Sequence, residues 1–130
     1  MPQIAMEILE PLCADVLAGA GMRAGDAAVT ARHLIDAEMK GVVSHGVQRV
    51  AYYLEQFDIG GARPAAEIAV EHRGSAVARI DGGTGLGILA MERAVEEALA
   101  MESPIVSLAI ENVAHTGRMG CSTERLAQKG

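Results

Sequence analysis

Aromatic residues are scarce in this sequence of 130 residues, which has two tyrosines, one phenylalanine and no tryptophan. So few rings do not provide the stacking surface on which single-stranded nucleic acids bind. Basic residues are also outnumbered, 11 against 17 acidic ones, and the formal net charge of −6 argues against a polyanionic partner. The composition therefore predicts a protein with no nucleic-acid partner.

Cysteine and long apolar runs are lacking as well. Cys13 and Cys121 stand apart with no CxxC spacing, so we expect two reduced thiols, no disulfide framework and no metal. No apolar run is long enough to span a membrane, and the start, Met1-Pro2-Gln3, does not have the basic-then-apolar pattern of a secretion signal. These absences predict a cytoplasmic protein without membrane contact.

Half of the residues are hydrophobic and 22% are charged, which excludes disorder and provides enough apolar material for a core. Helical periodicity runs through 4–17, 28–39 and 47–54, and glycines follow each run. Ser44 is the expected N-cap of the third helix, and Val47, Val50, Ala51 and Leu54 are expected to form its packed face. Residues 1–62 are therefore predicted to form a segment of three helices.

In the second half of the chain the periodicity changes. Alternating runs at 67–71 and 76–81 predict a hairpin. After a glycine-rich stretch, a helix is expected over 88–99, and the apolar run 105–110 is typical of a buried strand. Residues 63–130 are thus predicted to form a hairpin and a helix-strand-helix unit, and the whole chain to have a mixed α/β fold.

The third predicted helix carries polar side chains on one face. At 100° per residue His45, Arg49 and Tyr52 share a stripe, with Tyr53 at its edge and Ser44 at the helix start. An imidazole and a guanidinium near a helix N-terminus would suit a carboxylate. An ordinary N-cap followed by an exposed arginine and a packed histidine fits the same spacing, and the spacing does not separate the two interpretations.

A second candidate is His115, which follows the predicted buried strand. Gly117 and Gly120 lie close by, where a backbone can approach a ligand. With a reference pKa near about 6.5, an imidazole there can take or give a proton at neutral pH. A surface-loop histidine fits this position equally well. His33 and His72 have no comparable setting, and we assign them no role.

Residues 85–90 match the pattern GxGxxA that binds dinucleotides at the start of a helix. On this hypothesis the chain is a Rossmann dehydrogenase fragment in which Gly85, Gly87 and Ala90 contact a pyrophosphate and Glu111 a ribose. However, the preceding strand is expected to end at Asp81 and to pair as a hairpin. A tight strand-to-helix turn shaped by glycines is therefore the favoured interpretation.

Three motifs together resemble the malate/L-lactate dehydrogenase family, which includes ureidoglycolate and sulfolactate dehydrogenases. They are Ser44-His45-Gly46-Val47-x-Arg49 followed by Tyr53, Asp81-Gly82-x-x-Gly85-x-Gly87, and Asn112-x-x-His115-x-Gly117. The resemblance covers essentially the whole chain, but members of the family are considerably longer. It therefore indicates an N-terminal portion, with most of the cofactor-binding domain absent from this chain.

The resemblance implies an oxidoreductase that transfers a hydride between NAD or NADP and a small 2-hydroxy or 2-oxo acid. Substrates of the malate, lactate, ureidoglycolate or sulfolactate type, a non-Rossmann fold and a homodimer are implied in the same way. His115 would be the proton acceptor, and the acid in the reverse reaction. Ser44, His45, Arg49 and Tyr53 would bind the substrate, and no residue is assigned to the cofactor.

Arg118 stands where many relatives have a smaller residue, which implies a different substrate preference. An alternative from another class is a non-catalytic interaction module that keeps the helical segment for association. Such a module would be indifferent to a change of His115.

Overall fold

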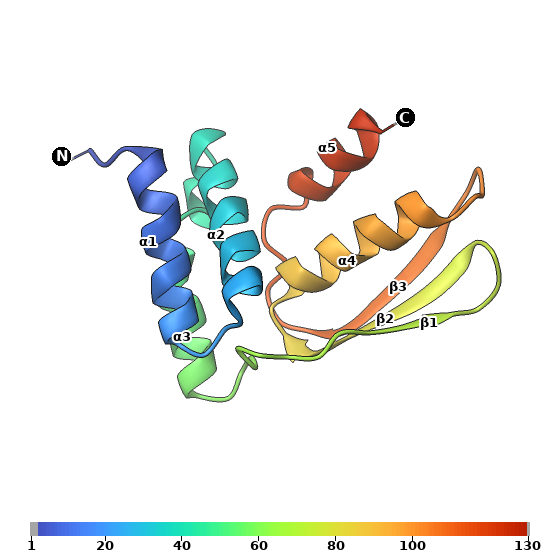
Figure 1. Cartoon of the computed structure of the whole chain (residues 1–130), viewed down its shortest axis with the longest axis horizontal. Helices are drawn as coiled ribbons and strands as arrows, with labels where there is room; N and C mark the ends of the chain where they lie inside the picture. Colours follow the sequence, from blue (N-terminus) through green and yellow to red (C-terminus); the bar gives the residue numbers. More distant parts are fainter. Residues whose placement is uncertain (1–2, 130) are drawn as a thin grey trace. The chain divides into compact units, whose positions relative to one another are not determined.

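The computed structural model describes residues 3–129, so the expectation built on Met1 and Pro2 lies outside the described residues. The chain divides into two compact units, Met1–Ala65 and Ala66–Gly130, which we call the helical unit and the sheet unit. Figure 1 shows both. None of the helices within residues 3–129 combines the length and the apolar character needed to cross a bilayer.

The helical unit contains the three predicted α-helices and one additional short helix. Its elements are α1 (Met6–Gly19), α2 (Ala24–Met39), the 3₁₀ helix η1 (Val43–His45) and α3 (Arg49–Asp58). The largest fully buried side chains include Leu17 of α1, Leu34 of α2 and Tyr53 of α3. Burial of these large side chains is the main stabilising contribution to this unit.

The third helix begins later than the sequence predicts. Ser44 does not cap an α-helix, because it lies within η1, and α3 starts only at Arg49. Gly46 has an extended backbone and separates the two elements. The packed face also differs, since Tyr53 is fully buried and Ala51 is exposed. A tyrosine ring removes far more apolar area from water than an alanine methyl group does.

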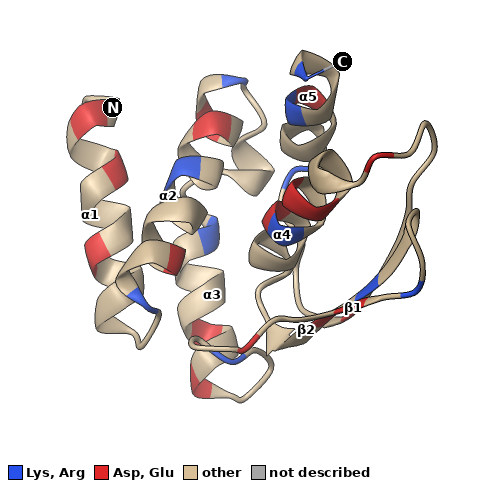
Figure 2. Cartoon of the chain, turned by 45° about the vertical axis from the view of Figure 1, so that its right-hand side comes forward, with Lys and Arg blue, Asp and Glu red and all other residues tan. Residues whose placement is uncertain are grey.

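One side of α1 is apolar and exposed. Three residues spaced four apart share this side, with exposed fractions between 40% and 63%: Ile8, Leu12 and Val16. Ile4, which precedes the helix, is 54% exposed. The opposite side, with Cys13 and Leu17, is buried where α1 packs against α2. Every charged residue on α1 is acidic, as Figure 2 shows.

The sheet unit contains a three-stranded sheet and two helices. Its elements are β1 (Ala69–His72), β2 (Val77–Gly85), α4 (Gly87–Ala100), β3 (Ser107–Val113) and α5 (Gly120–Gln128). The strand order is β1-β2-β3, with β1 antiparallel and β3 parallel to β2. The predicted hairpin, the helix-strand-helix unit and the mixed α/β fold are confirmed.

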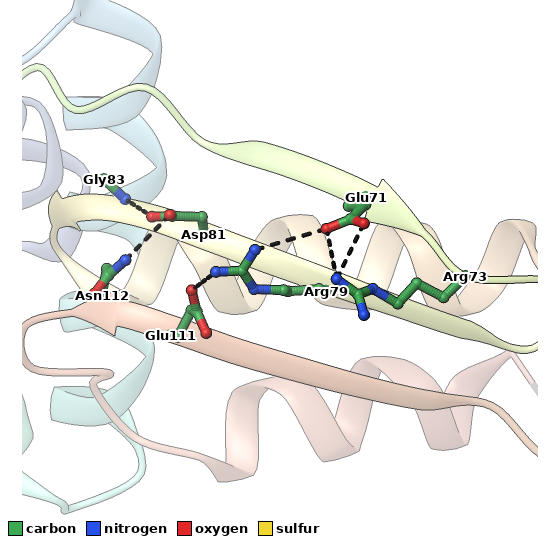
Figure 3. A network of polar contacts seen from close by, with 7 residues as sticks. All are labelled: Glu71, Arg73, Arg79, Asp81, Gly83, Glu111 and Asn112. Carbon is green, nitrogen blue, oxygen red and sulfur yellow. Dashed lines mark hydrogen bonds and ion pairs between the residues drawn. The ribbon is translucent and has the colours of Figure 1, made fainter.

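The two faces of the sheet differ in chemistry. On one face, which α4 covers in Figure 1, Ile80 of β2 forms a cluster with Ala90 and Ala94 of α4, and partly buried apolar side chains from β1 and β3 pack against it. Because successive strand residues point to opposite faces, the other face carries a polar network, drawn in Figure 3. In it, Arg79 forms ion pairs with Glu71 and with Glu111.

The prediction of a strand in 105–110 is confirmed by β3, but the prediction that this strand is buried is wrong for the described residues. β3 lies at the edge of the sheet, its residues alternate between exposed and half-buried, and Ile105 before it is 80% exposed. An apolar run raises the tendency to form a strand but does not determine how many neighbours the strand has.

The expected end of β2 at Asp81 is also wrong. The strand continues to Gly85 through a register shift: Asp81 pairs with Glu111, and Gly85 with Val113. Residues 82–84 of β2 therefore lie opposite the single residue Asn112 of β3. We call this irregularity the bulge. It contains two non-glycine residues with positive φ, Thr84 at 62° and Asn112 at 52°.

Candidate active site

His115 lies at the carboxyl ends of the two parallel strands. Its carbonyl oxygen accepts a hydrogen bond of 3.0 Å from the Gly87 N–H at the start of α4. One residue earlier, the Ala114 N–H donates to the Gly85 carbonyl over 2.9 Å. The segment that carries His115 is thereby joined to the β2–α4 connection, in the region where ligands bind to parallel sheets.

The imidazole ring of His115 is oriented by its own turn. The Gly117 N–H donates to Nδ1 over 3.2 Å, and the neutral ring therefore carries its proton on Nε2. Gly117 is buried and has a φ of +74°, a conformation that L side chains rarely adopt. For Nε2 to accept a proton, the ring's own proton has to move to Nδ1, and the Gly117 hydrogen bond then has to open.

The start of α4 is occupied by the protein itself. A Cβ atom on Gly87 would lie 2.8 Å from the Ala114 carbonyl oxygen and 2.9 Å from the Thr116 Cα. The Gly87 N–H, which would face a pyrophosphate in a Rossmann fold, is bonded to His115. β2 does run into the GxGxxA match, contrary to the expectation from sequence, but these glycines bring two backbone segments together rather than receive a phosphate.

The structure brings Ser44, His45 and Arg49 together in the helical unit. The Ser44 hydroxyl and the His45 Nδ1 are hydrogen-bonded at 3.0 Å, and the Arg49 Nε donates to the Ser44 carbonyl over 2.7 Å. The Arg49 guanidinium also stacks against the Tyr52 ring, 5.3 Å from its centroid. Ser44 is exposed, and His45 and Arg49 are half-buried. The result is a small donor-rich surface with one fixed cation.

Tyr53 lies inside the helical unit and has no exposed surface. Burial raises the pKa of its hydroxyl well above the usual value, and the positive charge of Arg49 opposes part of this shift. Its ring lies 5.9 Å from the Tyr52 ring, centroid to centroid. Tyr53 therefore supports this surface through its ring contact with Tyr52. Its predicted contact with substrate stays a prediction.

Sequence reasoning missed the importance of Glu38 for this surface. The Glu38 carboxylate, on α2, accepts a hydrogen bond of 3.1 Å from the Val47 N–H. A Cβ atom on Gly46 would lie 2.8 Å from the Glu38 Cδ, so glycine is the residue that lets the carboxylate reach the turn. The only signal in the sequence is an acidic residue eight positions before a glycine, which is too common to use.

Arg118 is mostly buried in the sheet unit. Its side chain is 15% exposed and forms an ion pair of 3.0 Å with Glu124 of α5. A Cβ atom on Gly120 would lie 3.0 Å from the Arg118 Cζ, so the guanidinium packs over the start of that helix. The substrate preference implied for this arginine stays a prediction.

The two remaining histidines have structural surroundings. His33 is buried in α2, and the Nε2 of His72 at the end of β1 lies 3.0 Å from a carboxylate oxygen of Glu97 of α4. Within residues 3–129, no group of three or more His, Cys, Asp or Glu side chains is placed to hold a metal ion. His115 belongs to the sheet unit, and the surface around Arg49 to the helical unit.

Comparisons of the sequence and of the structure with known proteins all match this chain to dehydrogenases. The family model described as malate/L-lactate dehydrogenase matches residues 4–130. The chain is 40% identical over 129 residues to (2R)-3-sulfolactate dehydrogenase (NADP(+)) of Chromohalobacter salexigens, with 98% of this chain and 38% of that protein covered. It is 28% identical to ureidoglycolate dehydrogenase (NAD(+)) of Escherichia coli, covering 98% of this chain and 37% of the relative.

The solved structure of malate dehydrogenase from Pyrococcus horikoshii superimposes on the chain with a TM-score of 0.92 at 29% identity. The match covers 98% of this chain and 37% of that one. The chain thus spans little more than a third of the length of the relatives it matches.

Proposed function

The chain belongs to the malate/L-lactate dehydrogenase family, and from this premise we propose that it is the N-terminal part of an oxidoreductase acting on a small 2-hydroxy or 2-oxo acid. The enzyme would transfer a hydride between that acid and NAD or NADP. Relatives named as sulfolactate, ureidoglycolate and malate dehydrogenases support the class of reaction. Its substrate would be an acid of the sulfolactate, ureidoglycolate, malate or lactate type.

The observation that carries the proposal is the fixed position of His115 at the ends of β2 and β3. Removal of a hydride from a carbinol carbon requires removal of the hydroxyl proton, and an imidazole can take it. With Nδ1 facing the Gly117 N–H, Nε2 is the nitrogen that would exchange this proton, after the ring's own proton has moved to Nδ1 and the Gly117 hydrogen bond has opened. In the reduction direction the protonated ring would return it to the oxygen of the 2-oxo acid.

Ser44, His45 and Arg49 are the residues we propose for binding the acid group of the substrate. Arg49 supplies a permanent positive charge, and one hydrogen bond to the Ser44 carbonyl and stacking on Tyr52 hold its guanidinium in place. Charge-assisted hydrogen bonds from a held guanidinium are stronger and more directional than those from a mobile one. Tyr53 would act through the packing beneath them.

The nicotinamide cofactor would supply or receive the hydride. The glycine-rich start of α4 does not fit a pyrophosphate, because the Gly87 N–H is bonded to His115 and the Ala114–Thr116 segment fills the adjacent space. We therefore assign no residue of this chain to the cofactor, and its site is proposed to lie in the part of the protein that relatives have beyond the matched region. A homodimer in the cytoplasm stays a prediction.

The direct test measures oxidation of NADH and NADPH by the protein as purified from its source, with a panel of 2-oxo acids. His115→Gln should lower turnover by roughly a hundredfold or more, because general acid–base catalysis contributes about 10²–10⁴-fold. His72→Gln is the matched control, because His72 lies on the same unit, where its exposed side chain contacts Glu97. If the parent is active and His115→Gln turns over at the parental rate, the role of His115 is refuted. The non-catalytic alternative predicts no turnover with any acid.

A further inference from the structure

The bulge between β2 and β3 is bridged by one side chain. Asp81, the last residue of β2 before the bulge, accepts a hydrogen bond of 2.8 Å from the Gly83 N–H at Oδ1. Its other oxygen, Oδ2, accepts one of 3.1 Å from the Asn112 side-chain amide. Figure 3 shows both contacts of the carboxylate, one to Gly83 and one to Asn112. One carboxylate therefore connects the inside of the bulge with the single residue opposite it.

Both partners of Asp81 have unusual backbones. Gly83 has a φ of +59° and Asn112 a φ of +52°, and neither conformation belongs to a regular strand. Without hydrogen bonds that hold it, a strand irregularity of this kind can return to a simpler register. A slip by one residue then moves every following side chain to the other face of the sheet. The hydrogen bonds to Asp81 hold the register shift between the Asp81–Glu111 and Gly85–Val113 pairs.

The register after the bulge determines where His115 lies. Gly85 pairs with Val113, the Ala114 N–H then bonds to the Gly85 carbonyl, and the His115 carbonyl bonds to the Gly87 N–H. Each of these contacts exists only if three residues of β2 face one residue of β3. The carboxylate of Asp81 is thus the side-chain group that fixes the starting point of this series of contacts.

We propose that Asp81 is a positioning residue for His115, holding the bulge in the register that places the imidazole for proton exchange with the substrate. The proposal rests on the proposed function of His115. It also explains why the Asp81-Gly82 motif and the Asn112-x-x-His115 motif occur in one sequence: they are the two sides of a single structural device.

The test uses the whole protein labelled with ¹⁵N-histidine, with a His115→Gln sample to assign the ring signals. In the parent, the neutral His115 ring should be the Nε2–H tautomer, since Gly117 donates to Nδ1. Asp81→Ala should give a mixture of tautomers and lower kcat about tenfold, with KM for the acid unchanged, because misplacement of a reacting group by a fraction of an ångström affects the chemical step. Asp81→Asn should restore both, because its amide can bond to the Gly83 N–H and, after Asn112 turns its amide over, to Asn112.

Two further variants separate positioning from general stability. Asn112→Gly keeps the positive φ and removes the amide, so it should reproduce the effect of Asp81→Ala even if Asp81→Ala folds poorly. Glu71→Ala removes a carboxylate with two partners from the same face of the sheet, away from the bulge, and should match the parent in spectrum and kcat.

Parental tautomer and kcat in both Asp81→Ala and Asn112→Gly would overturn the proposal. A changed tautomer in these variants, combined with a parent that turns over no 2-oxo acid, would support the positioning of the ring and count against the proposed function.

Discussion

Replacement of Gly87 by alanine tests the close approach on which the position of His115 depends. The new Cβ would lie 2.6 Å from the Thr116 Cγ2, 2.8 Å from the Ala114 carbonyl oxygen and 2.9 Å from the Thr116 Cα. Two of these three atoms are backbone, in a segment tied to Gly85 and Gly87 by hydrogen bonds, so the neighbours cannot rotate away as a side chain can.

The magnitude follows from two opposing effects. Overpacking a well-filled site costs about 1–3 kcal/mol. Alanine in place of glycine in a helix recovers at most about 0.5–1 kcal/mol. From the middle of each range the expected net loss is about 1 kcal/mol, which at a urea m-value of about 1–3 kcal/mol/M lowers the unfolding midpoint by roughly 0.5 M.

Gly25→Ala is the matched control for this experiment. Gly25 also lies in the first turn of a helix, α2, and a Cβ atom there would meet nothing within 4 Å. The control variant should therefore gain about 0.5–1 kcal/mol. Urea unfolding followed by circular dichroism, with the same protein concentration for all three proteins, measures both effects.

A Gly87→Ala protein as stable as the parent would refute the crowding argument, whatever the control does. Gly87→Arg extends the test to the dinucleotide hypothesis. A Rossmann fold predicts that this variant folds normally and loses only cofactor binding, whereas the present structure predicts a lower unfolding midpoint, because the larger side chain begins with the same Cβ.

Three further predictions concern the helical unit. The buried Tyr53 keeps its proton when tyrosines of the unfolded chain ionise near about pH 10. The free energy of unfolding of the parent should therefore fall as pH rises through that value, and that of Tyr53→Phe should fall less. Equal losses in urea midpoint would contradict this. Gly46→Ala should displace the Glu38 carboxylate from the Val47 N–H and speed hydrogen exchange at that amide, whereas unchanged exchange would mean that Glu38 does not hold the turn. Arg49→Lys should raise KM for the acid by about tenfold with little change in kcat, since lysine lacks the planar fork, and parental kinetics on every active acid would remove Arg49 from the site.

Much of the fold follows from local periodicity. α1 and α2 were predictable because the apolar positions of each helix repeat within its own sequence, and the hairpin because two alternating runs flank a short turn. The third helix was misplaced because its start depends on Glu38, a side chain of another helix, which satisfies the Val47 N–H and leaves Ser44 in a 3₁₀ turn. No local pattern contains that information.

The candidate site was also predictable only in part. A histidine after a strand and a polar cluster around Arg49 were visible in the sequence, and the structure brings Ser44, His45 and Arg49 into contact. The continuation of β2 beyond Asp81 was not predictable, because glycines weaken a strand and the contacts that accompany the pairing here, the hydrogen bonds of Asp81 and the Gly85–Val113 pair, come partly from a distant segment. The edge position of β3 depends on the number of strands in the sheet, which an apolar run does not encode.

The parallel pairing of β2 with β3 has a consequence for the order of folding. Partners in the β1–β2 hairpin lie close in sequence, such as His72 and Ala78, whereas partners across β2 and β3, such as Ala78 and Leu108, are thirty residues apart. Closing the longer loop has a larger entropy cost, and long-range strand pairing is slow compared with hairpin and helix formation. We therefore expect the hairpin and α4 to form first, and the turn of His115 to acquire its hydrogen bonds only in the final step of assembly. A protein of this kind would have no proton-exchanging group in place until its folding is complete.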